Sequence, residues 1–361
     1  MGVFLVTFMN YFFMNLNDRI SAFAELGHRL REGLEGKGEF AGQLGTVIDN
    51  QHINNPWFTP DNVRMAVGAI AGALTKSGLE QWTSAYPHLQ TEVKPMTVAV
   101  IMAGNIPAVG FHDMLSVLIS GNNLLAKTSA RDTDLINLFS EILCHINGKF
   151  RGKISVTDAQ VTGFDAVIAT GSDNSARYFE YYFGKYPSII RRNRNSLAIL
   201  EGNETDKELE DLGKDVFSYF GLGCRNVSKV YVPRGYDMER MIRSWEKFGA
   251  VISHSKYAGN YDFNKAVYLV NKEPFLDTGH LLIKKDSRLS SPVAVLYWDD
   301  YSSRDELAVQ TEALQKKIQC IAGYNYLPFG TTQYPDLWDY ADGVDTLLFL
   351  SEKKISGNIL L

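Results

Sequence analysis

The chain has 361 residues, of which 45% are hydrophobic and 21% charged, and its formal net charge is −5. This length exceeds the size at which one core stops growing, so two domains are expected, and the negative charge argues against nonspecific nucleic-acid binding. The three cysteines, Cys144, Cys224 and Cys320, lack the paired spacing of a zinc site. Thiols so widely spaced are typical of a reducing cytoplasm, and we expect a cytoplasmic protein without a metal.

The first thirteen residues, MGVFLVTFMNYFF, are apolar and contain no basic residue. They are too few to span a bilayer, and no small-residue cleavage site follows, so no integral membrane segment is expected. Residues 17–35 have the pattern of a helix capped by Asn17. Two interpretations of the apolar run stay open. It is an extension before a true start at Met14, or an arm that packs on a partner subunit.

Strands and helices alternate after a second expected helix over residues 60–85. Residues 97–102 form a continuous apolar run, which is typical of a strand buried on both faces of a parallel sheet. Further strands are predicted at NLLAK, FDAVIATGS and residues 196–200, and helices at GFHDMLSVLIS, residues 133–147 and DNSARYFEYYF, the last capped by Ser172 or Asp173. This order predicts an α/β fold, with a doubly wound Rossmann-like domain over residues 14–205.

A second α/β domain is predicted over residues 206–361. Thr205 and Glu208 have the spacing of a capping box, and Gly221 is expected to end the helix that they begin. Strands are predicted at NVSKVYVP, KAVYLVN, PVAVLYW, QCIAG and DTLLFL, and helices at YDMERMIRSWEKFG and DELAVQTEALQKKI.

Polar turns follow the predicted strands of the first domain. AGNIP, KTSARD and ATGSDN all lie where strands end, which is where ligands bind in open α/β sheets. No GxGxxG fingerprint is present, so the pattern alone leaves a nucleotide site as one alternative. Cys224, in YFGLGCRNVSK, also has two interpretations, because free cysteine is either a nucleophile or a small buried residue in a tight turn.

The segments IMAGNIP, NLLAKTS, IATGSDNSAR, GLGCRN and LPFGTTQ have the order and spacing found in the aldehyde dehydrogenase superfamily. The cysteine segment FGLGCRNVSKVYVP most closely resembles the acyl-CoA reductase (LuxC-type fatty acid reductase) family. The resemblance covers roughly residues 95–361. It implies an aldehyde dehydrogenase-like fold with a cofactor domain and a catalytic domain.

The resemblance implies that Cys224 attacks an acyl thioester and holds the acyl group as an enzyme thioester. Asn105 matches the asparagine that stabilises the oxyanion, together with the Cys224 backbone N–H. Because Cys224 follows a helix C-terminus, the helix dipole does not lower its pKa, and activation must come from a cation such as Arg225, from loop N–H groups or from a distant base.

The cofactor residues that the resemblance implies lie in two turns. Lys127 and Ser129 match positions that hold the adenosine ribose. NAD-preferring relatives often have a glutamate three residues after this lysine, and here Ala130 and then Arg131 follow. The missing carboxylate and the added guanidinium favour a 2′-phosphate, so NADPH is the expected cofactor. The turn Thr170, Gly171 and Ser172 opens a helix whose N–H groups can face a pyrophosphate.

Two acidic residues of the superfamily have no evident match. The position of the base that hydrolyses the thioester falls on or beside Arg191 and Arg192, and arginine cannot act as a general base here. This suits a reductase that releases an aldehyde. These arginines are candidates for binding the anionic acyl donor, acyl-CoA or an acyl carrier protein. The acid that contacts the nicotinamide ribose is also missing.

Three functional hypotheses follow. The leading hypothesis is an NADPH-dependent acyl thioester reductase. The others are a cysteine-dependent acyltransferase or acyl-binding protein without hydride transfer, and a cofactor-free scaffold subunit. The resemblance also implies that the strand at residues 345–350 pairs with a neighbouring subunit in a homo-oligomer, and the alternative is that it completes the protein's own sheet.

Overall fold

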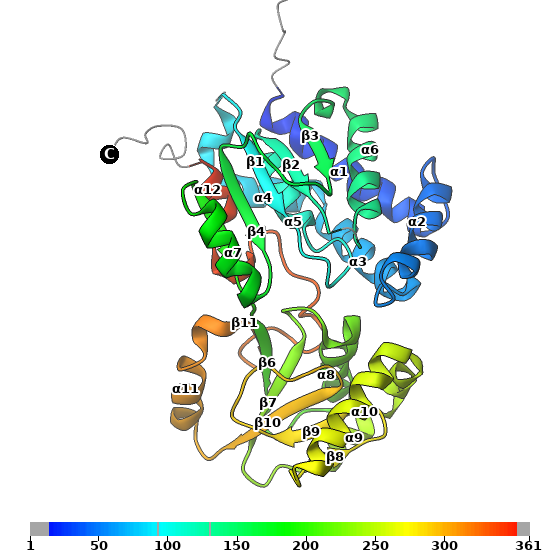
Figure 1. The fold of residues 1–361 in the computed structure, drawn as a ribbon, viewed down its shortest axis with the longest axis vertical. Helices are drawn as coiled ribbons and strands as arrows, with labels where there is room; N and C mark the ends of the chain where they lie inside the picture. Colours follow the sequence, from blue (N-terminus) through cyan, green and yellow to red (C-terminus); the bar gives the residue numbers. More distant parts are fainter. Residues whose placement is uncertain (1–13, 92–93, 130, 352–361) are drawn as a thin grey trace, which may run out of the picture.

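The computed structural model describes residues 14–91, 94–129 and 131–351. Residues 1–13, which contain the apolar run MGVFLVTFMNYFF, residues 92–93, Ala130 and residues 352–361 lie outside the described residues. Two α/β bodies follow one another along the long axis of the molecule (Figure 1). The helices are α1 (Leu16–Leu34), α2 (Ala41–Asn54), α3 (Pro60–Ala73), α4 (Lys76–Ser84), α5 (Phe111–Ile119), α6 (Asp134–Ile146), α7 (Asp173–Phe183), α8 (Asp206–Phe217), α9 (Met238–Ser244), α10 (Ser255–Val270), α11 (Arg304–Glu312) and α12 (Thr346–Ser351). The strands are β1 (Thr97–Ile101), β2 (Asn123–Lys127), β3 (Ile154–Thr157), β4 (Ala166–Thr170), β5 (Ser188–Arg191), β6 (Asn195–Ile199), β7 (Val227–Pro233), β8 (Leu276–Asp277), β9 (Leu282–Lys285), β10 (Val295–Tyr301) and β11 (Ile318–Gly323).

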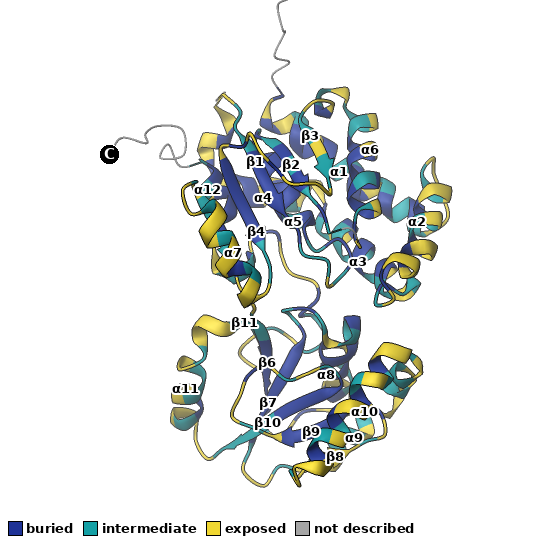
Figure 2. Ribbon diagram, in the orientation of Figure 1, coloured by how far each residue is buried: buried dark blue, intermediate teal, exposed yellow. Residues whose placement is uncertain are grey.

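The first sheet is parallel and, in the described part of the chain, has the order β3-β2-β1-β4-β5. Alternate residues of its strands face opposite layers, as the period of two requires. Val98 and Val100 pack with α1, α5 and α6, whereas Ala99 and Ile101 pack with α7. Both faces are therefore covered, which explains the continuous apolar run of β1 (Figure 2).

The strand order reverses between β1 and β4, which lie next to each other. Ligands bind at such a switch point, outside the carboxyl ends of the strands. Lys127 ends β2 opposite Ile101 of β1, and Thr170 ends β4 opposite Arg191 of β5. The turns selected from the sequence thus share one edge of the sheet.

The second sheet has the order β11-β6-β7-β10-β9-β8 among the described residues, and only the β8–β9 pair is antiparallel. Helices α8 and α9 pack on one face through Leu212 and Met241, and α11 packs on the other through Leu307. The capping box of Thr205 and Glu208 is present at the start of α8, as predicted. The prediction of a mixed α/β fold with doubly wound sheets is confirmed.

The change of sheet comes before the predicted domain boundary at residue 205. β6 pairs with β7 and β11 of the second sheet, although the sequence analysis assigned residues 196–200 to the first domain. At the other end of the chain, α12 packs on α5 of the first body, with Leu347 fully buried. We therefore propose that the chain passes to the second body between β5 and β6 and returns at its C-terminal end.

The C-terminal segment is a helix, so the predicted strand at residues 345–350 is wrong. Asp345 caps this helix by accepting a hydrogen bond from the Leu348 N–H at 2.8 Å. Leu347 and Leu350, three residues apart, are buried, whereas Leu348 is 49% exposed. The segment serves the protein's own core, and the edge-strand argument for a homo-oligomer loses its basis.

Three smaller expectations also change. KAVYLVN lies in α10, where Tyr257, Tyr261 and Tyr268 recur at helical spacing and are buried. The helix expected over 60–85 divides because Thr75 accepts a hydrogen bond from the Gly78 N–H and starts α4. Asn15, rather than Asn17, caps α1. Within the described residues, every helix is too short or too polar to cross a bilayer.

Candidate functional site

Cys224 sits in a strained turn between α8 and β7. Just before it, Tyr219 and Phe220 have φ angles of 50° and 58°, in the left-handed region that non-glycine residues rarely adopt. Each such residue costs about 1–2 kcal/mol, and it persists only where the surroundings hold it. Gly221, with φ of 76°, completes the reversal of the chain.

Asn226 holds this turn in place from inside the protein. Its side chain is almost fully buried. Its Nδ2 donates to the Ser218 carbonyl at 2.7 Å and to the Asp215 carbonyl at 3.0 Å, and its Oδ1 accepts from the Gly223 N–H at 2.8 Å. These bonds satisfy backbone groups that the end of α8 leaves unpaired.

Two neighbouring elements add further support. Ser196, in β6, donates from Oγ to the Cys224 carbonyl at 3.0 Å. Asp215 accepts from the Gly330 and Thr332 N–H groups and from the Thr332 hydroxyl, at 2.6–3.1 Å. The LPFGTTQ loop is thereby attached to the end of α8.

Asn105 lies against the cysteine turn, although 117 residues separate it from Leu222. Its Nδ2 donates one hydrogen to the Leu222 carbonyl at 2.9 Å. The amide carries a second hydrogen that can point elsewhere. The structure therefore brings Asn105 to the turn that carries Cys224, and the sequence analysis selected both residues from distant segments.

A cavity of about 220 Å³ opens beside Cys224. Its walls come from α3, from the β1–α5 turn, from the cysteine turn and from the segment after β11. The lining residues are Ala66, Ala69, Ile70, Ala73, Leu74, Ile106, Pro107, Ala108, Val109, Phe111, His112, Asp113, Leu115, Arg191, Tyr219, Cys224, Arg225, Gln319, Gln333, Pro335, Asp336, Leu337, Asp339 and Ala341. Most of them are apolar, and the charged ones include two ion pairs, Arg191 with Asp113 and Arg225 with Asp339.

Burial raises the pKa of the Cys224 thiol above its usual value of about 9, and Arg225 opposes this change. The Arg225 guanidinium pairs with Asp339 at 2.7 Å, and its Nη1 is buried with no hydrogen-bond partner among the described residues. A cation with an unused donor therefore lies beside the nucleophile. The other cysteines lie inside regular elements, Cys144 in α6 and Cys320 in β11, and burial raises the pKa of both thiols.

Arg191 and Arg192 already have carboxylate partners. The Arg191 guanidinium is buried and bonds to Asp113 and to the Thr346 hydroxyl of α12. Arg192 is exposed and pairs with Glu180 of α7. The structure thus does not bring the two together as a basic surface, and Arg191 serves an internal ion pair that closes one side of the cavity.

The predicted cofactor residues are spread along the carboxyl edge of the first sheet. Lys127 donates to the Asp158 carbonyl at 3.0 Å and lines a hollow of about 560 Å³. The hollow is rich in aromatic residues, including Phe164, Phe179 and Tyr182. A cation beside aromatic faces suits an adenosine group.

The other predicted cofactor residues do not line this hollow. Ser129 contacts the neighbouring turn so closely that a Cβ on Gly104 would lie 2.6 Å from its side chain. Arg131 is exposed, as is Ser172, which caps α7 by accepting from the Ser175 N–H at 3.2 Å. Thr170 and Gly171 immediately precede this cap and are partly buried.

Sequence reasoning missed the residues that hold the turn. Asn226 is the residue for which a local signal existed, since asparagine favours turns. His112, left unassigned from the sequence, lines the cavity and hydrogen-bonds the Leu337 carbonyl through Nε2 at 2.9 Å. Since a carbonyl only accepts, the proton lies on Nε2, and burial lowers the pKa of this imidazole.

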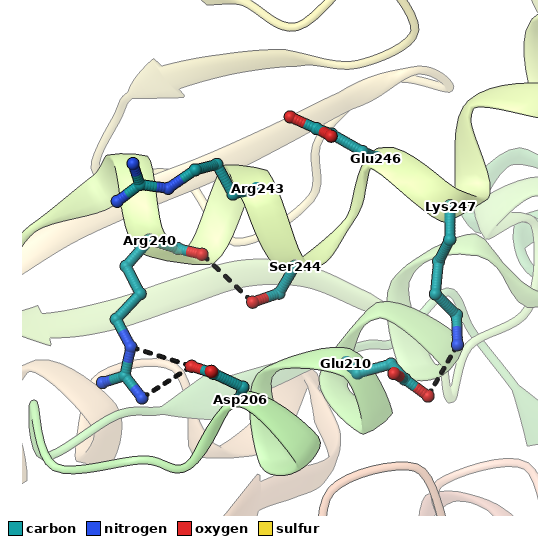
Figure 3. Close-up of a pocket in the computed structure, with 7 residues that line it drawn as sticks. All are labelled: Asp206, Glu210, Arg240, Arg243, Ser244, Glu246 and Lys247. Atoms are coloured by element: carbon teal, nitrogen blue, oxygen red, sulfur yellow. Dashed lines mark hydrogen bonds and ion pairs between the residues drawn. The ribbon is translucent and has the colours of Figure 1, made fainter.

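A third hollow, between α8 and α9, carries charges that cancel (Figure 3). Arg240 pairs with Asp206 at 2.8 Å and Lys247 with Glu210 at 2.6 Å. Arg243 and Glu246 add one charge of each sign. Such a mixed surface gives no preference for a charged ligand. Across the described residues, no group of three His, Cys, Asp or Glu side chains is placed to hold a metal ion.

Solved structures of similar fold are aldehyde dehydrogenases and related oxidoreductases. An oxidoreductase from Marinobacter aquaeolei gives a TM-score of 0.63 at 10% identity, with 82% of this chain and 71% of that chain covered. Lactaldehyde dehydrogenase from Escherichia coli gives 0.61 at 13%, covering 86% and 75%. Aldehyde dehydrogenase C from Pseudomonas syringae, solved with NAD+ and octanal, gives 0.58 at 12%, covering 89% and 83%. These identities establish the fold alone.

A search of curated protein sequences gives no match. Residues 66–241 match the family model described as acyl-CoA reductase (LuxC), a segment that contains Asn105, Lys127 and Cys224. Family and fold together support an oxidoreductase of the acyl reductase type. The resemblance to the acyl-CoA reductase (LuxC) family is thereby confirmed, on an aldehyde dehydrogenase-like fold.

Proposed function

We propose that the protein reduces an acyl thioester to an aldehyde with NADPH, through an acyl group held on Cys224. The observation that carries this proposal is that Asn105 is hydrogen-bonded to the turn that carries Cys224, and that Cys224 lines a largely apolar cavity. A nucleophile, an oxyanion donor and room for an acyl chain are the parts that acyl transfer needs.

Acylation begins with loss of the thiol proton, since the thiolate is the nucleophile. Cys224 Sγ forms a bond to the thioester carbon while the bond to the donor sulfur breaks. The donor leaves as a thiolate, which takes up a proton. The oxyanion formed on the way accepts hydrogen bonds from the Cys224 N–H and from the second hydrogen of the Asn105 amide.

Two of the three aspartates that line the cavity are poorly placed to hydrolyse the acyl-enzyme. Asp113 and Asp339 are each paired with an arginine, whereas the third, Asp336, is exposed to solvent. A carboxylate in such a pair is a poor base for activating water. Arg191 takes part in one of these pairs at the place where the superfamily resemblance implies a hydrolytic glutamate.

The carboxyl edge of the first sheet suits a dinucleotide, with Lys127 beside aromatic side chains. Bound there, NADPH would supply a hydride to the acyl carbon. Ser129 and the 170–172 turn lie along the same edge, and Arg131 is the candidate for the 2′-phosphate. Cys224 leaves as a thiolate when the aldehyde carbonyl re-forms, which returns the enzyme to its starting state.

The alternative is a cysteine-dependent acyltransferase that makes the acyl-enzyme but transfers no hydride. The missing acid for the nicotinamide ribose favours it. Incubation of the protein with octanoyl-CoA and NADPH separates the two. We expect NADPH to be oxidised, which is followed by the fall in its absorbance. The amount of octanal formed should equal the amount of NADPH oxidised. Release of CoA without NADPH oxidation would support the acyltransferase and contradict the reductase.

A further inference from the structure

The cavity beside Cys224 is bounded on one side by a stripe of small residues on α3. Ala66, Ala69, Ile70, Ala73 and Leu74 line the cavity, and their spacing of three and four residues places them on one helical face. Three of these five are alanines. Side chains that end at Cβ leave the space in front of this face open.

The position of α3 is fixed from its other side. Val63, Val67 and Ala71 are fully buried in the core that α3 shares with α1. A Cβ on Gly27 of α1 would lie 2.5 Å from the Leu74 carbonyl oxygen, so the two helices are in backbone contact. The alanine face is therefore a firm wall, since the helix cannot move back to enlarge the cavity.

The opposite wall is also apolar, and the far side is sealed by paired charges. Ile106, Val109 and Leu115 come from the β1–α5 turn and from α5. Asp113, on the same helix, is bonded to the buried Arg191. A hydrocarbon chain extending from Cys224 along these walls thus contacts apolar side chains up to a buried ion pair, and breaking that pair would be strongly unfavourable.

We propose that this cavity limits the length of the acyl chain that binds to about eight carbons, and that the Ala69 side chain sets this limit. A dry cavity of about 150 Å³ holds one benzene molecule, or roughly 25 Å³ per carbon. By that ratio, the cavity of about 220 Å³ holds roughly eight to nine carbons. The thioester part of this inference rests on the proposed function. The inferences about the size of the cavity and its preference for a hydrocarbon chain do not rest on the proposed function.

Binding of unreactive primary amides tests the inference without any catalysis. Calorimetric titration with butanamide, hexanamide, octanamide and decanamide measures how affinity depends on chain length. Each added methylene should tighten binding about three- to fourfold up to octanamide. Decanamide should bind no more tightly than octanamide, because its last carbons have no apolar wall to contact.

Ala69→Phe places a ring in the cavity and should weaken octanamide binding at least tenfold, moving the best ligand to butanamide or hexanamide. Ala69→Leu adds a smaller side chain and should shift the preferred amide length less, in the same direction. This variant replaces Ala69→Phe if the Ala69→Phe protein does not fold. Arg64→Phe is the matched control, because Arg64 is on the exposed side of α3, where its surface pair with Asp49 contributes little. The Arg64→Phe control should leave the dependence of amide affinity on chain length unchanged.

Affinity that does not depend on length, that rises through decanamide, or that changes equally in the Ala69→Phe and Arg64→Phe variants would overturn the inference. The same series with acyl-CoAs separates it from the proposed function. Length-dependent amide binding without acylation of Cys224 refutes the proposed function and leaves the cavity assignment standing. Acylation at one rate for every chain length refutes the cavity assignment alone.

Discussion

The turn that carries Cys224 is attached to the protein by hydrogen bonds of buried side chains, whereas Arg131 and Ser172, at the carboxyl edge of the first sheet, are exposed and bond within their own turns. Asn226, just before β7, and Ser196, in β6, both bond to the cysteine turn and are both buried. Ser172 caps its own helix, and the Arg131 N–H bonds the Ser129 side chain two residues away.

This difference matches what each side has to do. A nucleophile and its oxyanion donor must be positioned before the reaction, since small displacements lower the rate steeply. A large cofactor makes many contacts and can order an exposed edge as it binds. We therefore expect substitutions of the side chains that hold the cysteine turn, such as Asn226, to change chemistry and stability together, and those at the edge to change cofactor selectivity alone.

The largest effect is expected from Cys224→Ala. Thioester reduction should fall at least a thousandfold, because the covalent step has no other nucleophile. The folded structure should remain, since the change removes a single sulfur atom from a residue that is itself only partly buried. Stopped-flow measurement of NADPH oxidation checks the loss, with Cys144→Ala as the control. If the Cys224→Ala protein reduced octanoyl-CoA at a rate near that of the unaltered protein, the nucleophile would be wrongly assigned.

Asn226→Ala should lower stability and activity together. The change leaves the Gly223 N–H and two carbonyls without partners in the interior, at a cost of about 2–4 kcal/mol in the free energy of unfolding. Denaturant unfolding measures this, and Asn260→Ala is the control because Asn260 makes one exposed hydrogen bond. An unchanged midpoint would show that the turn is held by other contacts.

Arg225→Met should move the pH dependence of acylation. The thiolate is the reactive form, so the rate rises with pH toward the raised pKa of Cys224. Arg225 lowers that pKa, and its removal should move the profile to higher pH, with about a tenfold loss of rate at neutral pH if the profile moves by about one pH unit. Single-turnover acylation between about pH 6 and 9 measures the profile on both sides of neutrality. A uniform loss at every pH would mean that Arg225 acts by position and not by charge.

Arg131→Glu should produce the smallest change. Its side chain is exposed, and surface charges contribute little, so we expect the ratio of NADPH to NADH efficiency to fall only about fivefold. Lys256→Glu in exposed α10 controls for the change of net charge. Equal use of both cofactors by the unaltered protein would remove the argument for NADPH.

The parts of the fold that depend on near neighbours in sequence were predictable. The capping box at Thr205, the cap at Ser172 and the buried strand β1 all follow from patterns a few residues long. The structure of residues 345–350 could not be predicted in this way, because four consecutive apolar residues fit a strand or a helix equally well. Packing on α5 decides that the segment is a helix.

The candidate site could likewise be predicted only in part from sequence. Cys224 and Asn105 were selected from their segments, but no pattern connects Asn226 to Asp215 or Ser196 to the cysteine turn. Those contacts arise when β6 and β7 pair and α8 packs beside them. The sequence analysis placed the missing base on or beside Arg191 and Arg192, but it could not find the partner of Arg191, because Asp113 lies 78 residues away.

The most direct test is to find where the acyl group is held. The protein is mixed with octanoyl-CoA in the absence of NADPH, and its intact mass and its peptides are then measured. The account predicts one added octanoyl group, on the peptide that contains Cys224, and loss of that group when NADPH is added. A label on Cys144 or Cys320, or no label at all, would contradict it.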